Sequence, residues 1–160
     1  MAVVAYAAQH TGKFDPRAPG APVSGMARIV DGDSLEIAGV RIRLFGIDAP
    51  EARQQCRDTR SEPYACGREA TRALDRLVGG RTVTCQPVAH DRYDRDVATC
   101  DVIGRDLGDA MVRAGHARDY RSRGRYAAAE QEARAAKRGI WAGEFEDPQA
   151  WRRRETTSGK

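Results

Sequence analysis

Three short segments carry side chains whose types and spacing could do chemistry. They are residues 31–34 (DGDS), residues 43–51 (RLFGIDAPE) and residues 91–95 (DRYDR). Each alone has an ordinary structural explanation: a tight turn, a strand with its following turn, and a charged hairpin loop. Together they supply carboxylates and guanidinium groups from separate parts of the chain, which is a combination used on phosphate esters.

The carboxylates fit a metal site and the arginines fit a phosphate. Asp33 and Asp48 fall at the expected ends of strands, and two carboxylates with a backbone carbonyl and waters suit a hard cation such as Ca²⁺. Arg43 and Arg95 could counter negative charge on a phosphorus centre, while Glu51 could orient or deprotonate water. The set therefore has the composition that phosphodiester cleavage requires.

A three-stranded meander must position the first two segments. Strands are predicted at residues 26–30, 35–37 and 40–45, with turns at 31–32 and 38–39. In the third strand, aliphatic residues alternate with arginines, so Arg43 points away from the aliphatic face.

The rest of the chain predicts helices and a second hairpin. Helices are expected at residues 67–78, 107–114 and 126–138, each followed by a glycine, and a hairpin joins 82–88 to 97–103 around residues 90–94. A meander, a helix, a hairpin and two further helices indicate a small mixed β-barrel with helices.

Length and composition indicate one domain with flanking segments. We expect an N-terminal segment at 1–24, an ordered domain at 25–143 and a C-terminal extension at 144–160, with a solvated tail after Trp151. Residues 2–8 are apolar and could be the remnant of a signal peptide or a disordered tail. No apolar run reaches the roughly 20 residues of a membrane helix.

The charge favours a polyanionic partner. The formal net charge is +4 and the isoelectric point is near 9.1. An alternative is a solvated surface that is basic without a ligand.

The three segments resemble the signature of the staphylococcal nuclease family. That signature reads D-G-D-[TS], then R-L-x-x-[VI]-D-x-P-E, then D-[RK]-Y-G-R, and the likeness continues through G-H-A at 115–117 and A-R-A-A-K-R-G-I-W at 133–141. The likeness covers about residues 25–141. It implies an α+β fold, an OB-type five-stranded barrel with three helices. It also implies calcium-dependent cleavage of DNA and RNA that leaves 3′-phosphate ends.

The resemblance assigns a role to each matching position. Asp33 and Asp48 would ligate Ca²⁺ by carboxylate and Ala49 by its main-chain carbonyl, with Asp31 supporting the metal loop. Glu51 would be the general base.

Further positions would bind the substrate. Arg43 and Arg95 would clamp the phosphate and stabilise the five-coordinate transition state. Tyr93 and Tyr120 would contact the nucleotide, with ring stacking as one candidate contact.

Two positions depart from the family pattern. Ser34 replaces the commoner Thr and keeps the hydroxyl. Asp94 stands where Gly is usual; Asp tolerates a left-handed turn less well than Gly, and its charge beside Arg95 could weaken phosphate binding.

Two classes of function are compatible with this fold. The first is an exported, monomeric endonuclease acting on DNA and RNA. The alternative is a non-catalytic nucleic-acid-binding module. The acidic cluster favours the enzyme, because a binding module has no need for carboxylates that repel phosphate.

Four cysteines, none in a C-x-x-C pair, predict two disulfides. With the second hairpin centred between residues 92 and 93, Cys85 and Cys100 lie opposite each other at about 4.5–5.5 Å between Cα atoms. Cys56 and Cys66 bracket the loop between the candidate site and the first helix. Paired cysteines indicate a secreted or periplasmic protein; four reduced cysteines in a cytosolic protein are the alternative.

Overall fold

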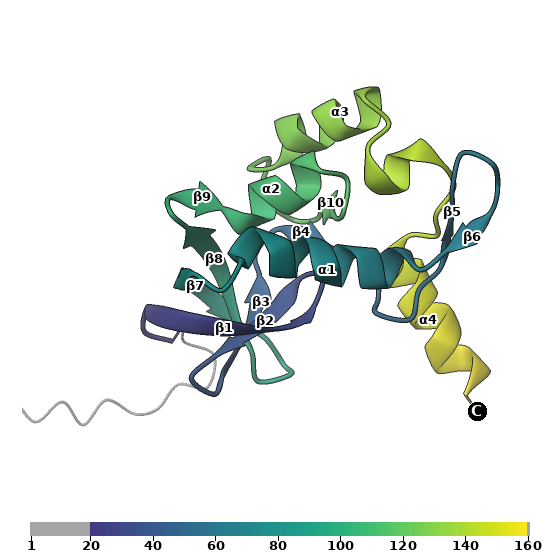
Figure 1. Ribbon diagram of the computed structural model, residues 1–160. Helices are drawn as coiled ribbons and strands as arrows, with labels where there is room; N and C mark the ends of the chain where they lie inside the picture. Colours follow the sequence, from purple (N-terminus) through teal and green to yellow (C-terminus); the bar gives the residue numbers. More distant parts are fainter. Residues whose placement is uncertain (1–19, 160) are drawn as a thin grey trace, which may run out of the picture.

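The computed structural model describes residues 20–159, and its centre is a closed five-stranded barrel (Figure 1). The strands are β1 (Val23–Asp31), β2 (Ser34–Ile37), β3 (Val40–Leu44), β7 (Thr82–His90) and β8 (Asp96–Val102). They pair in the order β3-β2-β1-β7-β8, and a parallel pairing of β3 with β8 closes the barrel. The predicted α+β, OB-type architecture is confirmed. The predicted signal-peptide remnant lies outside the described residues.

The meander forms as the alternation predicts. In β3, Ile42 and Leu44 are buried in the barrel core, while Arg41 is exposed and Arg43 is partly exposed on the other face. Arg43 lies directly opposite Ser34 of β2. The register therefore brings Arg43 next to the turn that follows β1.

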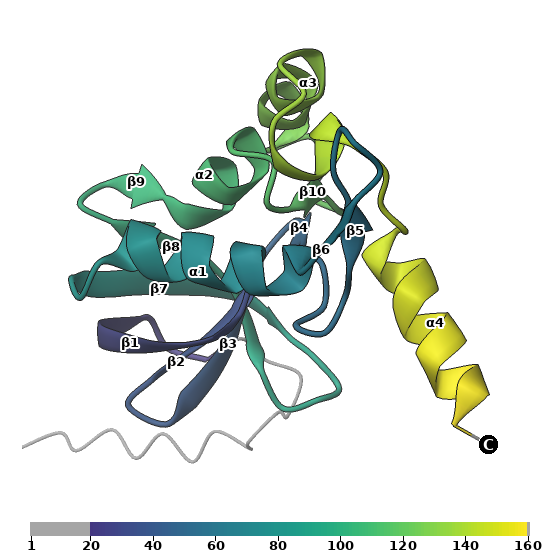
Figure 2. The same cartoon turned by 45° about the vertical axis from the view of Figure 1, so that its right-hand side comes forward.

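Helices pack around the barrel. They are α1 (Cys66–Val78), α2 (Leu107–Arg113), α3 (Ala127–Ala135) and α4 (Pro148–Ser158), with a 3₁₀ turn at Gly139–Ala142. Figure 1 shows α1 crossing the barrel, and Figure 2 shows α4 running down one side of the molecule, near the small β5–β6 hairpin. Three of these helices match the predicted ones, and none of the described helices combines the length and apolar character that spanning a bilayer requires.

Very short strands, which the sequence pattern did not predict, complete the fold. They are β4 (Ile47–Asp48) paired with β10 (Arg118–Asp119), β5 (Cys56–Arg57) paired with β6 (Pro63–Tyr64), and β9 (Arg105–Asp106), which extends the sheet beyond β8. A two-residue strand is too short to show a period of two. The β4–β10 pair matters most here because it fixes the backbone of Asp48 against Arg118.

The segment after Trp151 forms most of helix α4 and is not an irregular tail, although residues 153–159 are exposed to solvent, as the sequence predicts. Asp147 caps this helix by accepting hydrogen bonds from two N–H groups of its first turn, and Pro148 occupies the first turn. Asp147 also forms an ion pair with Arg118 on β10. The fully buried Gln54 donates to the Glu146 carbonyl at 2.7 Å. These contacts dock the start of α4 onto the loops beside the barrel.

Both predicted disulfides are present. Cys85 and Cys100 are cross-strand partners in the β7–β8 hairpin, with Cα atoms 4.1 Å apart. Cys56 and Cys66 link the β5–β6 hairpin to the start of α1. Because Cys85 and Cys100 are buried in the core, their bridge ties the barrel together.

Replacing Cys85 and Cys100 together by Ala should lower the free energy of unfolding by about 3 kcal/mol or more. The bridge closes a 15-residue separation, so its loss restores entropy to the unfolded chain, and the removed sulfur atoms leave space in the core. Urea unfolding followed by circular dichroism measures the loss. A decrease below about 1 kcal/mol would contradict a structural role for this bridge.

Candidate active site

The turn after β1 presents Asp33 toward the site. The Asp33 N–H donates to Asp31 Oδ1 at 3.1 Å, and the Ser34 hydroxyl donates to Asp33 Oδ1 at 3.0 Å. Gly32 lies against α1 and the 49–51 loop, where an added Cβ would come within 2.7 Å of the Ala70 methyl group. Gly32 is therefore needed for close packing of this turn rather than for a positive φ.

The second turn brings Asp48 beside Asp33. Asp48 is buried, at 2% exposure, in the two-residue strand β4. The next backbone N–H, that of Ala49, donates to Asp33 Oδ2 at 3.2 Å. One hydrogen bond thus joins two turns that are 16 residues apart in the sequence.

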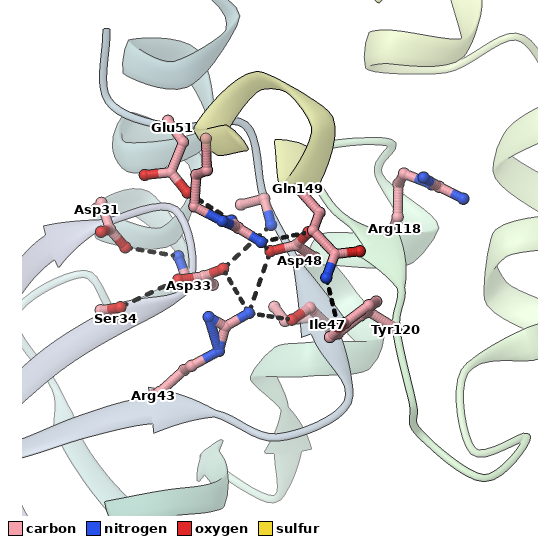
Figure 3. Close-up of polar contacts among 12 residues, drawn as sticks. Asp31, Asp33, Ser34, Arg43, Ile47, Asp48, Glu51, Arg118, Tyr120 and Gln149 are labelled. Atoms are coloured by element: carbon pink, nitrogen blue, oxygen red, sulfur yellow. Dashed lines mark hydrogen bonds and ion pairs between the residues drawn. The ribbon is translucent and has the colours of Figure 1, made fainter. Parts of the chain in front are cut away.

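Arg43 lies between these two carboxylates (Figure 3). Its Nη2 is 3.1 Å from Asp48 Oδ1 and 3.4 Å from Asp33 Oδ2, and it also donates to the Ile47 carbonyl at 3.1 Å. The Arg43 side chain is only 19% exposed. Its position is therefore set by three acceptors at once.

Glu51 is placed by a buried glutamine. The Glu51 N–H donates to Gln54 Oε1 at 3.1 Å. The Nε2 amide group of the same Gln54 donates to the Glu146 carbonyl. Gly67 at the start of α1 packs on the Glu51 carbonyl, where any side chain would clash. The Glu51 side chain is 30% exposed and lines the groove, so solvent can reach it.

Arg152 of α4 also enters the site, and sequence reasoning missed it. Its Nη1 is 3.0 Å from Asp48 Oδ1 and 2.5 Å from Glu51 Oε1, and its Nη2 is 3.3 Å from Asp48 Oδ2. The Asp-Pro pair at 147–148 could have indicated a helix start. No local pattern distinguishes Arg152 from its arginine neighbours.

Burial makes the acidic groups costly to ionise. Desolvation, and then repulsion by Asp33, raises the pKa of Asp31 to about 6. Desolvation also raises the pKa of Asp48, although the hydrogen bond from Arg152 opposes the rise. A nearby cation would relieve this cost, and the oxygen donors match the preference of a hard divalent ion.

The side chains alone do not form a complete metal cage. Within residues 20–159, no group of three or more His, Cys, Asp or Glu side chains is arranged to hold a metal ion. Asp33 and Asp48 are the carboxylates in position, and the remaining ligands would be the Ala49 carbonyl and waters. This smaller donor set fits Ca²⁺, which accepts backbone carbonyls and waters as ligands.

The predicted substrate residues surround one groove of about 1330 Å³. Its walls come from the β7–β8 hairpin, the loop after β10 and α4. Of the residues predicted for the site, the following line it: Asp33, Arg43, Glu51, Tyr93, Arg95 and Tyr120. Asp48 and Ala49 are buried and are not part of its lining.

The hairpin residues have partners of their own. Arg95 is 2.8 Å from Asp91 Oδ2 and lies over the Tyr93 ring, which is 56% exposed. Asp94 adopts the left-handed conformation, with φ of 59°, and its carboxylate pairs with Arg41 at 3.0 Å. The competitor for Arg95 is therefore Asp91, and not Asp94 as the sequence suggested.

Comparison with known proteins agrees with this geometry. Residues 41–143 match the family described as "Staphylococcal nuclease homologue". A succinoglycan biosynthesis protein of Rhizobium meliloti is 42% identical over 124 residues, which are 75% of this chain and 65% of the relative. An "Uncharacterized endonuclease" of Escherichia coli is 36% identical over 139 residues, covering 81% of this chain and 84% of the relative.

A "Probable staphylococcal-like nuclease" of Oryza sativa subsp. japonica is 38% identical over 117 residues, 71% of this chain but only 28% of the plant protein. The chain therefore spans less than two thirds of some of its relatives. The family match nevertheless covers most of the chain. It includes nearly all of β3, the whole of β7 and β8, and every candidate site residue except Asp31, Asp33 and the members of α4. The chain belongs to the staphylococcal nuclease family.

Proposed function

We propose that this protein is a calcium-dependent endonuclease that hydrolyses phosphodiester bonds of DNA and RNA and leaves 3′-phosphate ends. The observation that carries the proposal is the meeting of Arg43 with Asp33 and Asp48 at 3.1–3.4 Å, beside the Glu51 carboxylate and within a groove that Arg95 also lines. The relatives named as an endonuclease and as a staphylococcal-like nuclease support the same reaction class.

Asp33, Asp48 and the Ala49 carbonyl are the proposed calcium ligands. Bound Ca²⁺ would supply positive charge to the phosphate and help to activate water. The chain's own contribution is to hold two carboxylates at adjacent turns through the Ala49 N–H, while Asp31 braces the Asp33 turn.

Glu51 is the proposed general base. It would accept a proton from the attacking water as the water oxygen bonds to phosphorus and the bond from phosphorus to O5′ breaks, with O5′ taking up a proton from solvent to leave as a hydroxyl. This direction of cleavage leaves the phosphate on O3′. Gln54 and Gly67 fix the backbone of Glu51, so that its carboxylate faces the groove.

Arg43 and Arg95 are the proposed phosphate ligands. Arg43 already has a fixed position, whereas Arg95 would exchange its ion pair with Asp91 for one with the substrate. Guanidinium groups placed on the equatorial oxygens stabilise the charge that grows in the transition state. Tyr93 and Tyr120 would contact the nucleotide on either side.

The test is digestion of plasmid DNA and of RNA with Ca²⁺, repeated with EGTA. We expect cleavage only with Ca²⁺, and products that a polymerase extends only after phosphatase treatment. Binding of nucleic acid without cleavage under any of these conditions would instead support the non-catalytic module.

We further propose an exported, monomeric protein whose catalytic domain spans residues 25–143, with residues 144–160 contributing α4. Two disulfides favour an oxidising compartment such as the periplasm or the exterior. Fractionation of the native host, together with light scattering of the purified protein, tests both statements. A reduced cytosolic pool, or a mass of two chains, would contradict them.

Arg152 competes with calcium for Asp48, since its guanidinium contacts both carboxylate oxygens. Replacing Arg152 by Gln should therefore strengthen Ca²⁺ binding by about tenfold, the size of a typical coupling between competing ligands. Isothermal titration calorimetry measures the dissociation constant directly. Arg154→Gln is the matched control, because Arg154 pairs with Glu146 instead. Equal or weaker calcium binding by Arg152→Gln would contradict this competition.

A further inference from the structure

Helix α4 forms one wall of the groove. Gln149, Arg152, Arg153 and Thr156 follow the spacing i, i+3, i+4 and i+7, so they share one face of the helix, and all four line the groove. This helix lies beyond residues 41–143, the part that matches the family description. What α4 adds to the groove must therefore be inferred from its own residues.

Three guanidinium groups on the groove lining have no acidic partner. Arg92 on the hairpin, Arg121 after β10 and Arg153 on α4 are all exposed, and none is within ion-pair distance of a carboxylate in the described part of the chain. Arg154, in contrast, lies 3.1 Å from both Glu146 and Glu155. Of the six arginines that line the groove, Arg43, Arg95 and Arg152 pair with carboxylates, and the other three remain available to an external anion.

The groove is larger than a small ligand requires. Its volume of about 1330 Å³ exceeds the roughly 300–1,000 Å³ of typical small-molecule pockets. Tyr93 on the hairpin and Trp151 on α4 add aromatic surface to its walls. Unpaired guanidinium groups with aromatic rings are the features by which proteins bind single-stranded nucleic acid.

We propose that α4 is a strand-binding wall, in which Arg153 binds a phosphate of single-stranded nucleic acid outside the scissile bond. This inference rests on the proposed nuclease function and extends it to the nucleotides flanking the cut. Because the start of α4 is fixed by Asp147 and by the Gln54–Glu146 hydrogen bond, the subsite is held in place before substrate arrives.

The test compares Arg153→Gln with Arg154→Gln in the full-length protein. The two variants remove the same charge from adjacent positions of one helix, so they change the long-range field almost equally. Fluorescence anisotropy with a labelled 12-nucleotide oligothymidylate, in EDTA, gives the affinity at several salt concentrations. Circular dichroism melting verifies that both variants fold.

Arg153→Gln should weaken binding of the 12-mer by about fivefold to tenfold and reduce the slope of log K against log salt by about 0.7, the contribution of one single-strand phosphate contact. Arg154→Gln should stay within about twofold of wild type. Equal losses in the two variants, or no loss in either, would overturn the proposal. The proposal would also be overturned if a duplex 12-mer bound more tightly than the single strand and if Arg153→Gln weakened duplex binding as much as single-strand binding.

The binding assay is independent of catalysis. If the protein cleaves nucleic acid but the two variants bind alike, the strand-binding wall is wrong and the proposed function stands. If the variants differ as expected but no cleavage occurs, the wall stands and the proposed enzyme is wrong.

Discussion

Replacing Glu51 by Gln is expected to lower kcat for cleavage of single-stranded DNA by about 10²–10⁴-fold, the usual contribution of a general base. Gln has nearly the same shape, and its backbone N–H keeps the hydrogen bond to Gln54 Oε1. What disappears is the carboxylate that would accept the proton of water and that also pairs with Arg152. A continuous assay with a fluorescent oligonucleotide and saturating Ca²⁺ measures the loss.

Glu155→Gln is the control for this change, because Glu155 also lines the groove but pairs with Arg154 instead of the site carboxylates. It should leave kcat within about twofold of wild type. Calcium affinity, measured calorimetrically, should be kept in Glu51→Gln, since the proposed ligands are elsewhere. A Glu51→Gln enzyme with more than about a tenth of the wild-type rate would remove the base from the mechanism.

Arg43→Lys is expected to cost about 10²–10³-fold in kcat, although the charge is retained. One nitrogen of the guanidinium is within 3.4 Å of Asp33, Asp48 and the Ile47 carbonyl. The remaining nitrogen atoms of the planar group are left to bind phosphate. A lysine has a single nitrogen, which cannot both hold these acceptors and make a two-point contact with phosphate.

The control for Arg43 is two residues earlier on the same strand. Arg41 points to the same side of β3, but it is exposed and pairs with Asp94. Arg41→Lys should therefore leave kcat and KM within about twofold. If Arg43→Lys were as active as Arg41→Lys, Arg43 would be a structural counter-ion of the two carboxylates and not a phosphate ligand.

Local pattern was sufficient for the main elements of the barrel and its helices. The alternation in residues 40–44 predicts β3 with Arg43 on its outer face, and the apolar spacing of residues 67–78 predicts α1 to within one residue. The hairpin register that places Cys85 opposite Cys100 also follows from the sequence. These features depend on residues that are close in the sequence, so periodicity and spacing in the sequence are enough to predict them.

The motifs also gave the residues of the candidate site, but not all of their contacts. Asp33, Arg43 and Asp48 come from turns and a strand of one meander, so short spacing predicts that they meet. The assignment of Asp94 as a competitor for Arg95 did not hold, because hairpin geometry pairs Arg95 with Asp91 and directs Asp94 to Arg41. In a strand, successive side chains point to opposite faces, so a residue's position predicts its direction. In a loop this rule does not hold, and the sequence does not predict which way a side chain points.

By itself, the sequence determined the main strands and helices, the pairing of cysteines and the acid–arginine set, because each rests on periodicity or on short motifs, whereas the closed OB-type barrel was implied by the family resemblance. Only the tertiary structure decided that α4 docks against the site and that Arg152, 101 residues after Glu51, contacts its carboxylate. Contacts over such a separation depend on how segments far apart in the sequence pack against one another. Residues 152–154 are all arginines, so the sequence alone does not show which of them points into the site.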